Sequence, residues 1–116
     1  MSVSWSQTVS HAVTRELRAR RRGAVLAVRR MQGWLEGRGI KARVLGDLAR
    51  GTFGLQSPLE MLVVLDPGPQ RDEAVAALEA MAEGMPLVLT YFGDLETAAR
   101  KRALAEMKDA MALPVQ

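Results

Sequence analysis

Residues 5–36 carry an apolar repeat that predicts one helix, and its length most constrains how a chain of 116 residues can fold. The apolar side chains recur every three or four positions, which is the spacing of one helix face. Gly37 and Gly39 end the pattern. Because such a helix is long for a small domain, either it breaks near Gly23 or its first half projects and packs on another chain. The apolar positions are Trp5, Val9, Val13, Leu17, Ala24, Val28, Met31 and Leu35.

The chain contains no cysteine and a single histidine, His11. The lack of cysteine excludes structural disulfides, zinc–thiolate sites, iron–sulfur clusters and cysteine nucleophiles. One histidine argues against a multi-histidine metal site or a histidine-based triad within one chain. We expect a single domain over residues 1–116, with residues 1–22 as a helical extension. No apolar run approaches the length of a membrane span and no secretory pattern is seen, so we expect a cytoplasmic protein without a membrane partner.

Positive charge is concentrated in the first half of the chain. Residues 1–50 have a formal charge of +8 and residues 51–116 of −5, which gives +3 in total. This asymmetry favours an anionic partner such as nucleic acid, nucleotide or an acidic protein. The alternative is a solvated helix face that pairs with the acidic half of the same chain. The predicted nucleic-acid or partner surface consists of Arg15, Arg18, Arg20, Arg21, Arg22, Arg29 and Arg30.

The pattern after the long helix predicts three strands and two further helices. Since the link between the second and third strands contains a helix, it is long enough for these strands to be parallel. The glycine-rich segment 46–58 is expected to be a loop, and Asp94 is expected to cap the last helix. The predicted fold class is α/β, a small mixed sheet with packed helices. The strands are expected over 41–45, 59–65 and 87–92, and the helices over 70–83 and 95–111.

Residues 44–66 have the sequence VLGDLARGTFGLQSPLEMLVVLD, in which a glycine turn and a spacer precede an acidic residue at the start of an apolar strand. This arrangement resembles the minimal nucleotidyltransferases of the DNA polymerase beta superfamily. The resemblance covers residues 24–108 and implies the polymerase-beta palm type of α/β fold. The matching positions are Gly46, Ala49-Arg50-Gly51, Ser57 and Glu60, followed by the apolar residues 62–65 and Asp66.

The chain departs from the family pattern at the acidic positions. Pro58 stands at the first acidic position, Asp47 replaces the second member of the Gly-Ser turn, and the strand over 87–92 has no third carboxylate. In the family, these carboxylates hold divalent metals that neutralise a triphosphate and activate a hydroxyl. With Glu60 alone at the motif, a two-metal clamp is not supported. A carboxylate at Asp47 would also repel nucleotide phosphates.

We therefore expect a nucleotidyltransferase-like domain with a degenerate active site that acts as a binding or protein-interaction module. The first alternative is an active enzyme in which Asp47 and Glu60 form a shifted catalytic site and Glu60 holds Mg²⁺. Such an enzyme would transfer a nucleoside monophosphate from a triphosphate to an acceptor hydroxyl. The second alternative is a nucleic-acid-binding domain that uses the N-terminal arginines. The resemblance implies nucleotide contacts from Gly46, Asp47, Arg50, Gly51 and Ser57.

The resemblance also implies a protein partner, because several small relatives act beside a helical protein in toxin–antitoxin pairs. A homodimer through the N-terminal helix is a further expectation. A purely structural interpretation is also open, in which Gly46, Gly51 and Gly54 only form turns. In that case Glu60 would need an ion-pair partner, for which Arg50 and Arg43 are the candidates.

Overall fold

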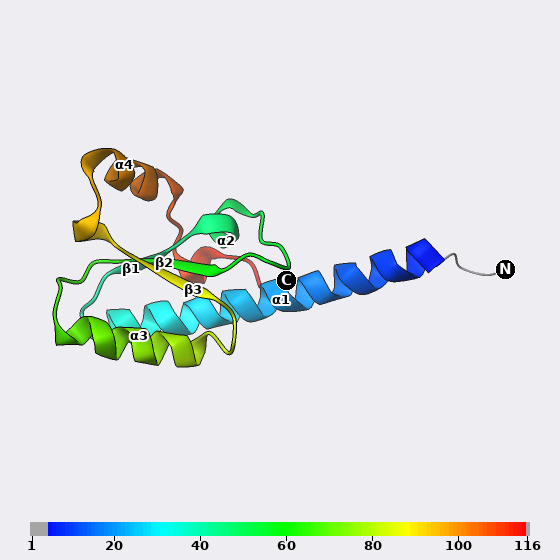
Figure 1. Cartoon of the computed structure of the whole chain (residues 1–116), viewed down its shortest axis with the longest axis horizontal. Coiled ribbons are helices and arrows are strands. Elements are labelled where there is room, and N and C mark those ends of the chain that lie inside the picture. The colour runs from blue at the N-terminus through cyan, green and yellow to red at the C-terminus, as the bar shows by residue number, and fades with distance from the viewer. Residues whose placement is uncertain (1–4, 116) are drawn as a thin grey trace.

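The apolar repeat forms one unbroken helix, α1 (Trp5–Glu36), in the computed structural model. The structure describes residues 5–115, with side chains from Ser10 onward, so residues 1–4 of the expected extension lie outside it. The helix does not break at Gly23. Figure 1 shows instead that its N-terminal part projects beyond the rest of the domain. Of the two outcomes allowed by the sequence, the chain adopts the projecting helix.

The described residues contain one three-stranded mixed sheet, which confirms the expected α/β class. The middle strand pairs antiparallel with the first strand and parallel with the third. Glu60 on the middle strand lies opposite Leu45 on one side and Val88 on the other. The parallel pair is joined through a helix, as the length of the connection predicted. The strands are β1 (Ala42–Leu45), β2 (Leu59–Val63) and β3 (Leu87–Tyr91), and the joining helix is α3 (Pro69–Met81).

Helices lie on both faces of the sheet (Figure 1). The main core forms where α1 and α3 pack against one face, and its fully buried side chains include Val28, Met31, Leu35, Met61 and Leu78. On the other face, Leu62 packs with Leu45 and with Ala103 of α4 (Thr97–Glu106). The sheet is therefore covered well on one face and only in part on the other. A cleft of about 720 Å³ remains beside α4, lined by residues that include Leu62, Val64, Phe92 and Leu104.

Arg29 fastens the C-terminal segment to α1. Its guanidinium donates hydrogen bonds to the carbonyl oxygens of Ala110 and Leu113, at 3.2 and 2.6 Å. Gln32, one turn further along α1, is 2% exposed and accepts a hydrogen bond from the Ala110 N–H at 2.9 Å. Gln32 also donates to Asp109, so both the oxygen and the nitrogen of the buried amide have a hydrogen-bond partner. Side chains of α1 thus satisfy backbone polar groups of residues 110–113, as strand pairing does in a sheet.

Three local predictions are wrong. The segment 46–58 is not all loop, because it begins with a short helix, α2 (Gly46–Arg50). Asp94 does not cap the last helix; its carboxylate accepts hydrogen bonds from Arg71 at 2.8 and 3.1 Å. That helix ends at Glu106 rather than at Met111, because Lys108 pairs with Val44 as an antiparallel bridge. In the described part of the chain, no helix combines the length and apolar character needed to cross a membrane.

Val63 and Val64 provide a matched test of this packing, because the two neighbours have the same side chain and differ in burial. Val63 is 1% exposed and lies in the main core, whereas Val64 is 49% exposed. We expect Val63→Ala to lower the free energy of unfolding by about 2 kcal/mol through lost burial and a residual cavity. Val64→Ala should cost less than about 0.5 kcal/mol. Urea denaturation of both variants measures the difference, and equal losses would contradict the assigned register of β2.

Candidate functional site

Gly46 begins the site at the junction between β1 and α2. Its φ of +75° lies in the left-handed region, where glycine avoids the steric cost that a Cβ imposes. The side chain of Glu60, on the adjacent strand, lies directly against Gly46, so that a Cβ added there would overlap its carboxylate. Two physical requirements therefore favour glycine at this position. The close contact brings the expected acidic residue to the start of α2.

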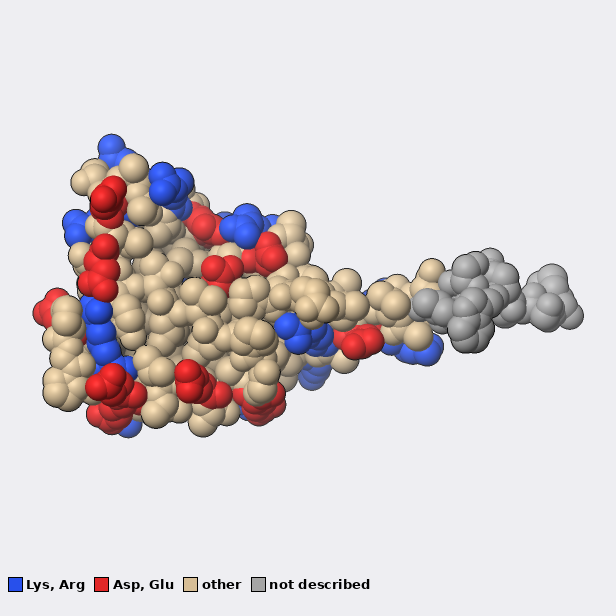
Figure 2. Space-filling view, in the orientation of Figure 1, with Lys and Arg blue, Asp and Glu red and all other residues tan. Residues whose placement is uncertain are grey.

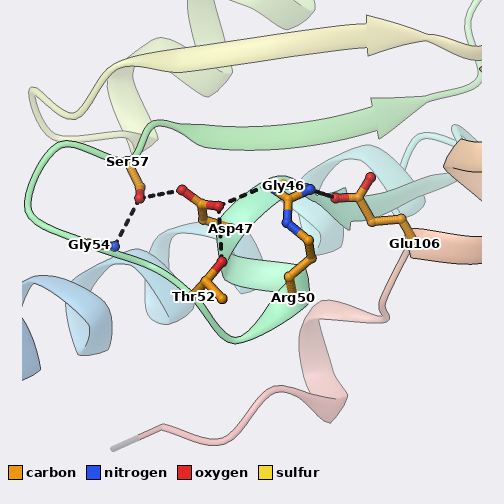
Figure 3. Close-up of polar contacts among 7 residues, drawn as sticks. All are labelled: Gly46, Asp47, Arg50, Thr52, Gly54, Ser57 and Glu106. Carbon is orange, nitrogen blue, oxygen red and sulfur yellow. Dashed lines mark hydrogen bonds and ion pairs between the residues drawn. The ribbon is translucent and has the colours of Figure 1, made fainter.

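Asp47, the first residue after Gly46, is held by three side-chain donors (Figure 3). The Ser57 hydroxyl donates to Oδ2 at 2.6 Å, while Thr52 and Arg50 donate to Oδ1 at 3.0 and 2.8 Å. These hydrogen bonds, with that of Ser57 contributing most, lower the pKa of Asp47 from 3.8 to about 2. The carboxylate is therefore ionised at neutral pH, and its acceptor capacity is directed inward to its own loop.

Arg50 joins α2 to the end of α4. Besides Asp47, its guanidinium contacts Oε1 of Glu106, the last residue of α4. The same Glu106 oxygen accepts a hydrogen bond from the Gly46 N–H at 3.0 Å. Figure 3 shows Arg50 between these two carboxylates, which come from separate elements. Arg50 is the positive charge that allows them to approach one another.

Glu60 lies against Gly46, beside Asp47, Arg50 and Glu106, and makes no ion pair within the described residues. Burial raises its pKa, the nearby charge of Arg50 opposes that rise, and the charges of Glu106 and Asp47 add to it. The expected ion pair between Glu60 and Arg50 or Arg43 does not form. Arg50 binds the other two carboxylates, and Arg43 pairs with Glu36 at 3.0 Å.

A second arginine holds the loop that carries Ser57. Arg20 of α1 donates to the carbonyl oxygens of Gly54 and Ser57, at 3.2 and 2.8 Å, and lies 5.4 Å from the centre of the Phe53 ring. Within the loop, the Gly54 N–H donates to the Ser57 hydroxyl oxygen at 2.9 Å. This bond leaves the hydroxyl proton for Asp47. The orientation of Ser57 is thus fixed from both sides.

The structure brings most of the predicted motif residues together, and adds others. Gly51 has a φ of +80° and ends α2, so its role in the structure is to turn the chain toward Thr52. Thr52 lies within the motif but its hydroxyl was not singled out from the sequence. Glu106 has no local signal, because it reaches the site only through the path of α4. The predicted residues that meet are Gly46, Asp47, Arg50, Ser57 and Glu60.

Protein donors already bind three oxygens of these carboxylates. Mg²⁺ needs free oxygen ligands in near-octahedral order. Both oxygens of Asp47 already accept hydrogen bonds, and Oε1 of Glu106 accepts from both Arg50 and Gly46. No set of three histidine or carboxylate side chains in the described residues is arranged to hold a metal. The guanidinium of Arg50 takes the central position between the acids.

The predicted basic surface divides into two groups. Arg20 and Arg29 bind backbone carbonyls, Arg21 donates to the carbonyl oxygen of Pro114 at 3.0 Å, and Arg30 pairs with Glu83 at 2.9 Å. The other three arginines are exposed and have no ion pair within the described residues. Figure 2 shows basic side chains along the projecting helix and acidic ones along the edge formed by α3. The exposed group consists of Arg15, Arg18 and Arg22.

No known protein family, curated protein or solved structure matches this chain. The function is therefore inferred from the polar cluster of Asp47, Arg50, Glu60 and Glu106 and from the exposed arginines of α1.

Substitutions at Gly46 and Gly51 distinguish the cost of a strained backbone from the cost of a steric clash. The two φ angles are nearly equal, but only Gly46 lies against the Glu60 side chain. We expect Gly51→Ala to cost about 1–2 kcal/mol of unfolding free energy, from the left-handed backbone alone. Gly46→Ala should cost a further ~1–3 kcal/mol because the Glu60 side chain must move. Chemical denaturation measures both. Adding Glu60→Ala to Gly46→Ala should remove the excess, and a double variant as unstable as Gly46→Ala would contradict the contact.

Proposed function

We propose that the chain is a nucleotidyltransferase-like domain that has lost metal-dependent nucleotidyl transfer and acts as a binding or protein-interaction module. The sequence of elements supports this assignment, since a long helix, a strand, a short helix, a strand, a helix, a strand and a helix follow one another around a mixed sheet. The resemblance implies the same order except for the short helix α2, which occupies part of the segment expected to be a loop. Gly46 stands at the strand-to-helix junction, where the motif requires a glycine.

The observation that carries the loss of transfer is the position of Arg50 between Asp47 and Glu106. In a metal-dependent site, the carboxylates are free to bind cations that neutralise the triphosphate. Here the guanidinium of Arg50 already pairs with two of them and offsets part of their charge, and the third, Glu60, has a raised pKa because it is partly buried. The cluster is therefore stabilised as an ion-pair network of the protein itself.

The test is binding and transfer with a nucleoside triphosphate and Mg²⁺. We expect calorimetry with ATP to show no Mg²⁺-dependent binding, and labelled ATP to transfer no nucleotide to the protein or to added RNA. A transfer activity that is abolished in Glu60→Gln and retained in Glu79→Gln would overturn the proposal. Glu79 is the matched control because it is an exposed glutamate of α3, outside the motif and the cluster.

Whereas the unmodified chain is expected not to respond to Mg²⁺, a variant that lacks the charge of Arg50 is expected to respond. In Arg50→Met, three carboxylates lose their nearby positive charge. We expect the melting temperature of this variant to fall in the absence of divalent cations, because like charges then lie close together. Added Mg²⁺ or Mn²⁺ should raise the melting temperature of Arg50→Met and leave that of the unmodified chain unchanged. Equal responses of the two proteins would mean that Arg50 does not replace a cation at the cluster.

Nucleic-acid binding is a second candidate, favoured by the exposed arginines of the projecting helix. At helical spacing Arg15, Arg18 and Arg22 lie on one side, together with His11. A row of cations on one side of a helix can contact successive phosphates of a nucleic-acid backbone. The four arginines that bind groups of the domain itself are not needed for this surface.

The salt dependence of binding tests this second function. We expect Arg15→Gln with Arg18→Gln to weaken binding to mixed-sequence duplex DNA or RNA and to reduce the salt slope by about 0.9 for each lost phosphate contact. The matched control is Lys101→Gln with Arg102→Gln, which removes the same charge from exposed positions of α4. Equal effects of the two double variants would show that net charge, and not this row, determines binding.

A further inference from the structure

The cleft beside α4 is large enough to hold a small molecule. Its volume of about 720 Å³ lies within the roughly 300–1,000 Å³ that is usual for small-molecule sites. Val64 and Leu104 line the cleft and are each 49% exposed, although large apolar side chains are more often buried. No residue of the polar cluster lines it, so the cleft is a separate site.

On the sheet side of the cleft, cationic and apolar residues lie in neighbouring rows. Arg43 of β1 lies opposite Leu62 of β2, and the side chains of directly opposite residues point to the same face of a sheet. The Val64 N–H donates to the Lys41 carbonyl oxygen at 2.9 Å, which continues the ladder by one more pair. Residues two apart along a strand also share a face. Each of the two pairs therefore places a cation beside an apolar side chain.

The sides of the cleft that come from α4 and from the end of β3 are apolar. Leu104 lies in α4, Met107 directly follows that helix, and Phe92 directly follows β3. The charged residues of the lining come instead from the segment 36–43, where α1 ends and β1 begins. The cleft thus has one charged side and is otherwise lined mainly by apolar side chains.

The charged side carries a net positive charge. Arg43 pairs with Glu36 at 3.0 Å and also donates to the Ala42 carbonyl oxygen at 2.8 Å. The exposed Lys41 makes no ion pair within the described residues. Because Arg43 and Glu36 offset each other, the net charge of this side is that of Lys41. A cation beside an apolar surface is complementary to an acid that has an apolar body.

We propose that the cleft binds a medium-chain carboxylate, with its alkyl chain against Val64 and Leu104 and its carboxylate beside Lys41. Burial of the apolar surface of the cleft and of the alkyl chain drives the binding. The carboxylate lies at the exposed Lys41, where it keeps part of its hydration while the ammonium group offsets its charge. A nucleoside triphosphate does not suit this space, because it carries several negative charges and the described lining offers one unpaired cation.

Titration of the isotope-labelled full chain with decanoate, followed by NMR, tests the site. We expect saturable shifts of the amide signals of Leu62, Val64 and Leu104, at decanoate concentrations below those at which micelles form. Because no nucleotide is present, the result is independent of the test with ATP. Shifts that do not saturate, or that map outside the cleft, would overturn the proposal. If a partner protein covers the cleft instead of a small acid, decanoate gives no saturable shift and the proposal fails.

A comparison of decanoate with decanol tests the position of the carboxylate, because decanol has the same alkyl chain and no charge. We expect Lys41→Gln to weaken decanoate binding about two- to five-fold, the contribution of one exposed ion pair, and to leave decanol binding unchanged. The matched control is Lys101→Gln, which removes the same charge from an exposed position of α4 that does not line the cleft. Equal losses for the two ligands, or for the two variants, would contradict the proposed arrangement.

Two valines with similar exposure test the position of the alkyl chain. Val64 lines the cleft, whereas Val88 of β3 is 43% exposed and does not. We expect Val64→Gln to weaken the binding of both decanoate and decanol about five- to ten-fold, through lost apolar burial, and Val88→Gln to leave it unchanged. The melting temperature checks that each variant is folded, and Leu104→Gln, at an exposed position of α4, provides a second variant of the cleft. Binding that is the same in all three variants would overturn the proposal.

Discussion

Burial of the C-terminal half of α1 against the sheet determines where the other elements can lie. Its apolar side chains pack against β2 and α3 in the main core. The same helix also holds the two segments that no strand pairing secures, because Arg20 binds the loop before β2 and Arg29 binds the C-terminal turn. Hydrogen bonds from a charged donor are among the stronger ones in proteins. The irregular segments are therefore fixed relative to α1.

The polar cluster has opposing dependences on pH. The hydrogen bonds to Asp47 lower its pKa to about 2, so the stability that they contribute is present above pH 3.8 and is lost as the pH falls toward 2. The raised pKa of Glu60 acts in the other direction, because burial favours its neutral form and the associated stability is lost as the pH rises above 4.5. Arg50 contacts both Asp47 and Glu106 and balances their charges in part. The positive charge beside these carboxylates is therefore supplied by Arg50, a residue of the same chain.

The predictable parts of the fold are those with a long or strict pattern. The extent of the long helix and the three strands were indicated by periodicity, and the parallel crossover by the length of its connection, whereas the continuity of the helix at Gly23 was left open. The short helix α2 was missed because it has only five residues and lies between Gly46 and Gly51, which suggest turns. The end of α4 depends on the pairing of Lys108 with Val44, which are distant in sequence. No local pattern contains that contact, and the same is true of Asp94 with Arg71.

The candidate site shows the same division. Asp47, Arg50 and Ser57 were expected near Glu60 because they belong to one contiguous motif, and the structure places them there. The third carboxylate, Glu106, comes from the end of α4, where the resemblance gave no reason to look. Its arrival changes the chemistry of the site, since Arg50 is then shared between two acids. A motif can indicate which residues meet, whereas the charge balance among them depends on elements that fold in from elsewhere.

The position of Arg20 connects the two functional candidates in space. It lies where α1 leaves the domain, and it binds the carbonyl oxygen of Ser57, whose hydroxyl donates to Asp47. Asp47 contacts Arg50, which contacts Glu106. A continuous series of hydrogen bonds thus runs from the base of the projecting helix to the end of α4. The loop at 54–57 is therefore the point at which the base of the projecting helix is joined to the polar cluster.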